Sequence, residues 1–360
     1  MRPPARSSGD PTEVTLVMEA TLAFVLGATI EVAAGDDLAA AAARARPGDV
    51  LRLSAGLHRG APGRLSGVAV EGAGAGVTVV RAPEGEDGLV ATGEVSLRGL
   101  SIHAGPGRSA LKVLGGAVRA EDVALHGGSC GAFVDGGAIS GRGVDLGGEY
   151  GLLVRRGRAS IEGGSARGTG AGVAVVFGEL ILRRFAIVGP AREGGLSVAG
   201  GSATLEAVTL RAPGPSGITV SGGGRVDGIA VTVAGASESS GFLGDCAQVI
   251  RGSLTLSGST LVRCAGAAVE ASAGETALLG VDATGGAAGC LVFVNGARAR
   301  LEGNVCAGRG PGLVLSGGAQ ATAIANRWWT DPALWVECGS GSRVRLGRGE
   351  TLAEPCAAAR

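Results

Sequence analysis

Apolar and polar residues alternate along most of the chain in short runs, and these runs repeat. The segments 109–125, 133–146, 195–210 and 312–326 each contain an apolar alternation, a Gly-Gly turn and a second alternation. Alternation over about four to eight residues is typical of strands with one buried face. Each segment therefore predicts two short strands joined by a tight turn, and the similarity of the segments predicts a structural repeat.

The repeat has the length of one coil of a solenoid. When each unit is aligned on the residue two positions before its strongest valine, the mean spacing is about 22 residues, and a single spacing of 30 marks an insertion at 236–246. The aligned positions are Leu89, Leu111, Ala132, Leu152, Val173, Leu196, Ile218, Gln248, Val269, Val292, Leu313 and Leu334. Short strands at this spacing predict a parallel β-solenoid of about 12–13 coils, in which coils stack ~4.8 Å apart around one core.

A short amphipathic segment precedes the repeats. Residues 36–59, DDLAAAAARARPGDVLRLSAGLHR, predict a helix near 36–46, a Pro-Gly-Asp turn and a strand. With the repeat, this segment resembles the right-handed β-helix repeat proteins of the pectin-lyase-like superfamily. The resemblance covers roughly residues 30–345 and implies an all-β, right-handed parallel β-helix with a short N-terminal capping helix. A left-handed hexapeptide helix is the rival architecture, and the aliphatic residues lack its six-residue spacing.

The two ends of the chain differ from the repeats. Residues 1–14 predict a flexible leader, 15–347 a single β-helix domain, and 348–360 a C-terminal cap or tail. The apolar segment 14–32 is interrupted by Glu19 and lacks a clear small-residue cleavage site. We therefore interpret it as a strand that leads into the capping helix, with a signal peptide as the alternative.

Composition narrows the function classes. Glycine accounts for 69 of 360 residues, which suits a chain that turns a corner several times in every coil. Basic and acidic residues number 32 each, so the formal net charge is zero and a nucleic-acid partner is not expected. No apolar run reaches the roughly 18 residues that a transmembrane helix needs.

The outward column of the first predicted strand lies one residue after each aligned position. It is mostly apolar and contains one lysine and one glutamate, Lys112 and Glu270, which are seven coils apart. The polysaccharide-cleaving enzymes of the resembled fold need several ionisable groups together on such a face. The sequence therefore predicts no catalytic residue, no cofactor and no metal site there. A cluster of Asp227, Glu238 and Asp245 around the insertion is the remaining catalytic route.

The same column predicts a candidate binding surface, extended by three tryptophans near the C-terminal end. Its residues are Phe133, Leu153, Phe293, Val314, Trp335, Trp328 and Trp329. Two other interpretations remain open. In the first, a loop or a terminal segment covers the apolar column; in the second, the tryptophans close the C-terminal end of the core.

A second column, ten residues after the aligned positions, carries alternating charges in five successive coils. Its members are Glu121, Arg142, Glu162, Arg183 and Glu206. Stacked strands place such residues about 5 Å apart, so opposite charges face one another. The pattern predicts a surface ladder of ion pairs rather than an acid–base site.

Six of the seven cysteines lie in the last 115 residues. Sequential pairing gives Cys246–Cys264, Cys290–Cys306 and Cys338–Cys356, and it leaves Cys130 free. Separations of 18, 16 and 18 residues are each slightly less than one coil, which returns the chain beside itself within disulfide reach. A zinc site is the alternative, although no CxxC motif occurs and the histidines lie upstream.

These observations predict a non-catalytic, exported or cell-surface β-helix that binds a polysaccharide or another surface protein. Disulfides place it in an oxidising location: secreted, periplasmic or on the cell surface. The alternatives are a polysaccharide lyase, hydrolase or epimerase of the same fold, and an intracellular structural protein. The sequence does not specify an oligomeric state.

Overall fold

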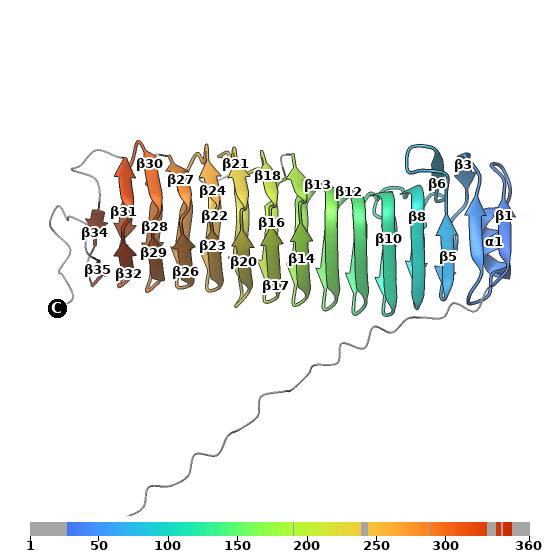
Figure 1. Ribbon diagram of the computed structural model, residues 1–360, viewed down its shortest axis with the longest axis horizontal. Helices are drawn as coiled ribbons and strands as arrows, with labels where there is room; N and C mark the ends of the chain where they lie inside the picture. Colours follow the sequence, from blue (N-terminus) through green and yellow to red (C-terminus); the bar gives the residue numbers. More distant parts are fainter. Residues whose placement is uncertain are drawn as a thin grey trace, which may run out of the picture.

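The computed structural model describes residues 27–189, 191–238, 244–286, 288–329, 336–339 and 341–347. All its named strands pair in parallel with strands one coil away, and the chain winds into a solenoid of about 14 turns (Figure 1). The predicted all-β parallel β-helix is therefore confirmed. It has more turns than expected because short strands before Leu89 already stack on one another. The predicted leader and C-terminal tail lie outside the described residues.

The coils build three parallel sheets along the length of the molecule. The first sheet contains β4 (Gly63–Leu65), β7 (Leu89–Ala91), β9 (Leu111–Leu114), β11 (Cys130–Asp135), β16 (Gly194–Ala199), β19 (Ser216–Ser221), β22 (Asp245–Ile250), β25 (Val269–Ser272), β28 (Leu291–Val294), β31 (Leu313–Leu315) and β34 (Val336–Cys338). The second sheet contains β1 (Thr29–Val32), β2 (Val50–Leu53), β5 (Val68–Glu71), β14 (Glu179–Arg183), β17 (Ser202–Glu206), β20 (Arg225–Ile229), β23 (Ser253–Ser257), β26 (Glu275–Leu279), β29 (Arg298–Glu302), β32 (Gln320–Ile324) and β35 (Arg343–Leu346).

The third sheet contains β3 (Gly56–Arg59), β6 (Thr78–Arg81), β15 (Ala186–Val188), β18 (Thr209–Arg211), β21 (Thr232–Ala234), β24 (Thr260–Val262), β27 (Asp282–Gly285), β30 (Val305–Gly308) and β33 (Arg327–Trp329). Four longer strands turn a corner and belong to more than one sheet: β8 (Glu94–His103), β10 (Ala117–His126), β12 (Ala138–Arg155) and β13 (Arg158–Val176).

The core is a set of stacked columns of aliphatic side chains. The predicted inward column pairs in register from coil to coil, and each member is at most 1% exposed: Val134, Val154, Val175, Val198 and Val220. Each such side chain contributes about 1.5–3 kcal/mol when it leaves water. Since one coil has no partner for its inner face, the stability of each coil depends on its neighbours.

The N-terminal end of this core is covered by the helix α1 (Leu38–Arg44), within the predicted range of 36–46. The Asp37 carboxylate caps the helix by accepting a hydrogen bond from the backbone N–H of Ala40 at 3.0 Å. Leu38 and Ala41 are buried, so the helix presents its apolar side to the first coils. Within the predicted strand over 14–32, the structure has a strand at β1, and residues 14–26 lie outside the described residues.

A glycine is required where the chain turns between the first and second sheets. Gly116 has a φ of +67°, and a Cβ atom on it would lie 2.4 Å from the carbonyl oxygen of Gly93 in the preceding coil. Coils stack too closely at this corner for any side chain.

Three of the twelve aligned positions were wrong. The register places Ala247, Leu291 and Val336 where the sequence predicted Gln248, Val292 and Leu334. At the first of these, Ala247 and Val249 alternate with Gln248, and the alignment took Ile250 instead of Val249 as the inward residue. At the second, the apolar run Leu291–Val294 has no alternation, and the pattern does not show which residues face inward.

The cysteines follow the predicted pairing where it is described. Cys246–Cys264 and Cys290–Cys306 form disulfides, with Cα–Cα distances of 5.3 and 6.1 Å, and Cys130 is free and buried. Each bond joins two points of a single coil, as the spacing predicted. The third predicted pair includes Cys356, which lies outside the described residues, and it stays a prediction.

The charge ladder forms on the second sheet, extended by Arg98 at its start. Its register is Arg98, Glu121, Arg142, Glu162, Arg183 and Glu206. The charges make separate ion pairs instead of one continuous chain: Arg98–Glu121 at 3.7 Å, Arg142–Glu162 at 3.7 Å and Arg183–Glu206 at 3.1 Å. Glu162 is also contacted by Arg184.

The helix α1 is too short to cross a bilayer, and no other helix in the described part of the chain is long and apolar enough to do so.

Candidate functional site

The outward face of the first sheet carries the predicted binding surface. Its central column runs in register through Val90, Lys112, Phe133, Leu153, Ala174, Ser197, Thr219, Gln248, Glu270, Val292, Val314 and Glu337. Phe133, Leu153 and Val314 face outward and are half-buried. Lys112 and Glu270 are seven coils apart, as counted from the sequence.

Other predicted surface residues lie elsewhere. Phe293 is 0% exposed and stacks between Ala271 and Leu315 in the core, so its assignment to the surface was wrong. It follows from the misaligned position at Val292. Trp328 and Trp329 belong to the third sheet; the first packs partly on the core and the second is 68% exposed. Trp335 lies outside the described residues.

Lys112, the only lysine of the chain, is held in a half-buried ion pair. Its Nζ lies 2.7 Å from Oδ2 of Asp87, and the two side chains are 27% and 13% exposed. The other carboxylate oxygen of Asp87 accepts a hydrogen bond from the backbone N–H of Ser109 at 2.9 Å. The ladder arginines Arg98, Arg142 and Arg183 are 47–75% exposed. The ammonium group of Lys112 is therefore more enclosed than the guanidinium groups of the ladder.

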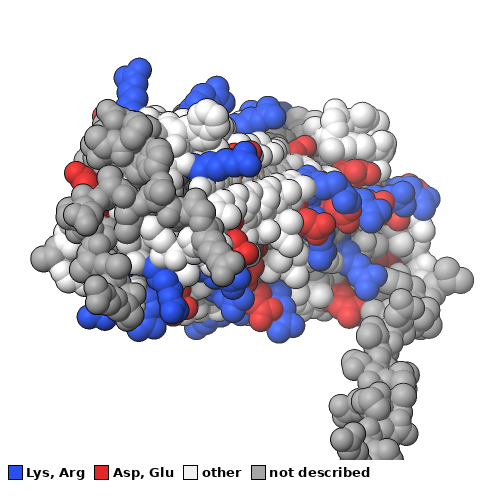
Figure 2. Space-filling view, turned by 60° about the vertical axis from the view of Figure 1, so that its left-hand side comes forward, with Lys and Arg blue, Asp and Glu red and all other residues white. Residues whose placement is uncertain are grey.

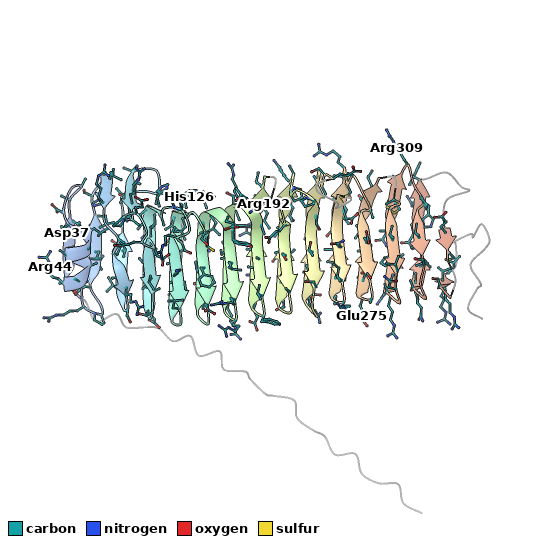
Figure 3. All side chains as sticks on the ribbon, turned by 180° about the vertical axis from the view of Figure 1, so that it is seen from behind. Asp37, Arg44, His126, Arg192, Glu275 and Arg309 are labelled. Carbon is teal, nitrogen blue, oxygen red and sulfur yellow. A yellow bond between two sulfur atoms is a disulfide. The ribbon has the colours of Figure 1, made fainter. Side chains whose placement is uncertain are left out.

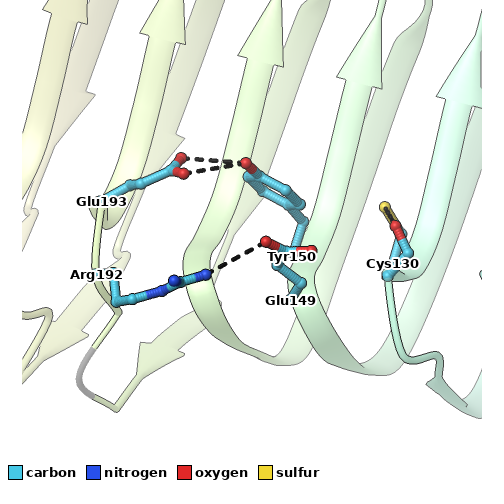
Figure 4. Close-up of polar contacts among 6 residues, drawn as sticks. Cys130, Glu149, Tyr150, Arg192 and Glu193 are labelled. Carbon is cyan, nitrogen blue, oxygen red and sulfur yellow. Dashed lines mark hydrogen bonds and ion pairs between the residues drawn. The ribbon is translucent and has the colours of Figure 1, made fainter. Parts of the chain in front are cut away.

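Tyr150, the only tyrosine, lies where β12 enters the first sheet, two coils after Lys112. Figure 4 shows its hydroxyl pointing toward Glu193. Its hydroxyl is 3.2 Å from both carboxylate oxygens of Glu193, and the adjacent Glu149 pairs with Arg192 at 3.4 Å. Burial, with the negative charge of Glu193, raises the pKa of the Tyr150 phenol above its usual value. The phenol is therefore protonated at neutral pH and donates to Glu193.

Cys130 lies beside this group. It pairs in register with Tyr150, and its Sγ is 3.7 Å from the Ser129 hydroxyl. Burial raises the pKa of its thiol, and hydrogen bonds from Ser129 and Ser109 oppose the shift only in part. The thiol is therefore un-ionised at neutral pH and is poorly suited to act as a nucleophile.

An aromatic ring and a paired arginine complete this end of the face. The guanidinium carbon of Arg155 lies 5.3 Å from the ring centre of Phe133, within cation–π range. Arg155 and Arg156 both contact Asp135, at 2.5 and 3.2 Å. The hydrogen bond from Arg155 is the main reason that the pKa of Asp135 lies below its usual range.

The central column holds one ionisable group more than the sequence predicted, because the register places Glu337 where Trp335 was expected, in addition to Lys112 and Glu270. Beside this column, the return loops and strand starts add Asp87, Tyr150 and Glu193. Each of these three residues precedes an aligned position, so none belongs to the outward column that the sequence predicted. The sequence did offer one signal, since the only lysine and the only tyrosine fall on one face.

A second polar group lies on this face next to the insertion. Asp245, at the start of β22, is 3% exposed, and its Oδ1 accepts a hydrogen bond from the backbone N–H of Ala267 at 2.6 Å. Its carboxyl also hydrogen-bonds that of Glu270 in the next coil. Burial, supported by the charge of Glu270 and opposed by the Ala267 hydrogen bond, raises the pKa of Asp245 to about 7. The two carboxyls therefore share a proton below neutral pH.

The catalytic cluster considered around the insertion does not form. Asp227 lies on the second sheet and pairs with Arg225 at 2.6 Å, and Glu238 is exposed in the return loop. Of the three, only Asp245 lies on the first sheet, and it is buried there. It hydrogen-bonds Glu270, for which the sequence predicted no charged partner.

The histidines lie away from this face. His58 is buried, with its Nε2 2.9 Å from the carbonyl oxygen of Ser54, and the rings of His103 and His126 stack 5.1 Å apart on the third sheet. Burial, together with the neighbouring His126, lowers the pKa of His103. Within the described ranges, no three His, Cys, Asp or Glu side chains are arranged to hold a metal ion.

Comparisons with known proteins give structural likeness alone. No protein-family model and no curated protein sequence matches the chain. Among solved structures, the A-module of the mannuronan C-5 epimerase AlgE4 from Azotobacter vinelandii is 16% identical, covers 82% of this chain and 90% of its own, and has a TM-score of 0.49.

Two further solved structures are similar at lower scores. The catalytic domain of a GH87 α-1,3-glucanase is 11% identical, with coverage of 95% and 70% and a TM-score of 0.34. The Dettilon tailspike protein is 14% identical, with coverage of 82% and 64% and a TM-score of 0.43. At these identities, the site of this chain must be judged from its own geometry.

Proposed function

We propose that this protein is an exported, non-catalytic β-helix whose first sheet binds an extended polysaccharide. The observation that carries the proposal is the group of enclosed, mutually paired polar side chains around Lys112 and Tyr150. Ammonium, carboxylate and phenol groups are fixed there on a strand face, and Phe133 lies in the neighbouring coil. Sites that pair fixed hydrogen-bonding groups with an exposed ring surface suit sugars, which present hydroxyls at the edge and C–H groups on the faces.

The shape of the face favours a polymer. Successive coils repeat the same strand about every 4.8 Å, so groups on neighbouring coils meet successive parts of an extended ligand. Serine, threonine and glutamine continue the central column at Ser197, Thr219 and Gln248. A chain of sugars that lies along the column meets these neutral hydrogen-bonding groups between the Lys112 and Tyr150 group and the Asp245–Glu270 pair.

The same geometry argues against cleavage. The Tyr150 phenol is protonated and the Lys112 ammonium is paired with Asp87, so neither is a free base. Asp245 and Glu270 hydrogen-bond each other, which is closer than the ~5 Å or more between the two carboxyls of glycoside hydrolases. The paired groups therefore suit binding better than bond breaking.

An enzymatic role is the second candidate, and one observation favours it. The pKa of about 7 for Asp245 gives a carboxyl that can donate a proton near neutral pH. If the chain acts on a polysaccharide, Asp245 is the group on which activity is expected to depend.

Export is supported by the disulfides. Two bonds that each close one coil persist only in an oxidising compartment, outside the cytosol of most organisms. We infer that the protein works outside the cell, in the periplasm or on the cell surface.

Binding is tested with the purified chain on a polysaccharide array, followed by calorimetric titration of the ligand that binds best. Tyr150→Phe removes one hydroxyl from the site and keeps the ring. We expect it to weaken binding at least fivefold. Thr204→Val removes an exposed hydroxyl from the second sheet and serves as the matched control. Absence of any polysaccharide ligand, or equal affinities for the two variants, would contradict the proposal.

A further inference from the structure

The last coils of the second sheet carry a grid of arginines. Arg298 on β29 and Arg343 on β35 lie in one column with Gln320 between them, while Arg300 and Arg345 lie in the next outward column with Thr322 between them. Two coils separate the arginines of one column, about 10 Å, and two residues separate the columns, about 6.7 Å. The grid therefore has arginines at its four corners and an amide and a hydroxyl in its middle row.

The charge of this grid is largely uncompensated. Arg300 pairs with Glu302 at 2.9 Å. Among the residues that the structure describes, Arg298, Arg343 and Arg345 have no ion pair. The ladder further up the same sheet alternates in sign and is paired. Figure 2 shows that acidic and basic side chains lie side by side over much of the surface in that view. The last coils thus depart from the charge pattern of the rest of the sheet.

The grid borders a hollow of about 440 Å³, lined by Arg298, Arg343 and Arg345 and by Gln320 and Thr322. The buried Ala299 and Ala321, which lie between the two outward columns, also line it. Glu275, the preceding residue in the Arg298 column, projects from the lower edge of the molecule in Figure 3 and is the last acidic residue of that column among the described strands. An anionic ligand fits this hollow because guanidinium groups approach it from both ends.

The geometry points to a second binding site at this end of the second sheet, for a polysaccharide that bears carboxylate or sulfate groups. Arginines bind such oxyanions through two parallel N–H donors. Gln320 and Thr322 lie between the charges, where they are placed to meet the neutral hydroxyls of the same sugars. Spacing along the coils lets one extended chain contact both ends of the grid.

The composition of the grid favours a glycan over a nucleic acid. Single-stranded nucleic acids are held by aromatic side chains that stack on their bases. The grid contains none, and the described tryptophans Trp328 and Trp329 lie on the third sheet. This site is separate from the Lys112 and Tyr150 group and does not depend on the function proposed for the first sheet.

The test uses the full-length protein and affinity electrophoresis in gels that contain polygalacturonate, heparin or dextran. Arg343→Gln/Arg345→Gln is the test variant, and Arg98→Gln/Arg183→Gln removes two arginines from the same sheet as the matched control. We expect the test variant to bind polygalacturonate or heparin at least tenfold more weakly, and the control to change by less than twofold. The polygalacturonate and heparin arms distinguish carboxylate from sulfate recognition.

Since β35 is the last strand described, Arg298→Gln on the interior strand β29 provides a second variant, with an expected loss of about threefold. Retention in dextran is expected to be the same for the wild type and the three arginine variants. Equal losses in the test and control variants, or no loss in either, would overturn the inference. So would tighter binding of a single-stranded DNA of equal charge.

Discussion

The buried carboxyl of Asp245 makes a sharp prediction about pH. The group is 3% exposed, accepts a hydrogen bond from Ala267 and shares a proton with Glu270, and its pKa rises from 3.8 to about 7. Between about pH 4 and pH 7 the carboxyl is protonated in the fold and ionised in the unfolded chain. Unfolding then releases a proton, so the free energy of unfolding falls as pH rises through this window.

The size of the effect follows from the pKa. A displacement of the pKa from 3.8 to about 7 corresponds to about 4 kcal/mol at ~1.4 kcal/mol for each pH unit. This is an upper limit, because Glu270 takes part in the same proton equilibrium. Asp245→Asn keeps an oxygen that can accept from Ala267 and places an amide donor toward Glu270, without a charge that must be buried.

We therefore expect Asp245→Asn and the wild type to be similarly stable at pH 5, and the variant to be more stable by about 1–4 kcal/mol at pH 8. Urea denaturation followed by circular dichroism at both pH values measures the difference. Asp227→Asn, at an exposed carboxyl of the second sheet, is the control and should keep the wild-type dependence on pH. A variant that is no more stable than the wild type at pH 8 would refute the reasoning.

Four further predictions concern other parts of the molecule. Arg142→Glu places three carboxylates side by side in the ladder and should destabilise the fold by about 1 kcal/mol; an unchanged urea midpoint would count against it. If all three predicted disulfides form, alkylation of the unreduced, unfolded protein should label one thiol, Cys130, as read by mass; further labelled thiols would disprove the third pair. Each closed loop of about 18 residues is worth ~3 kcal/mol, so a reductant should lower the melting temperature, and an unchanged value would show that the bonds contribute little. Incubation with pectate, alginate and chondroitin, with and without Ca²⁺, should release no unsaturated or reducing ends; release that Asp245→Ala abolishes would establish an enzyme.

The repeating pattern by itself determined the architecture. A repeat of about 22 residues with alternating strands buries its apolar positions when equivalent residues stack from coil to coil. The inward valines, two disulfides and the charge ladder all follow from counting within that period, whereas the capping helix follows from the amphipathic segment 36–59 and its resemblance to other β-helix proteins. The valines and the ladder depend on neighbours one coil away, and the disulfides on a chain that returns beside itself after nearly one coil, which is the distance that the period measures.

The tertiary structure decided what counting within the period does not reach. The apolar run Leu291–Val294 has no alternation, and a shift of one residue there moved Phe293 from the predicted surface into the core. The groups around Tyr150 and Asp245 lie where return loops meet the first sheet. Loop length, unlike strand alternation, obeys no fixed period. Which polar groups meet there depends on how each loop folds back over the sheet, and that is a property of the folded coil rather than of the pattern that predicts it.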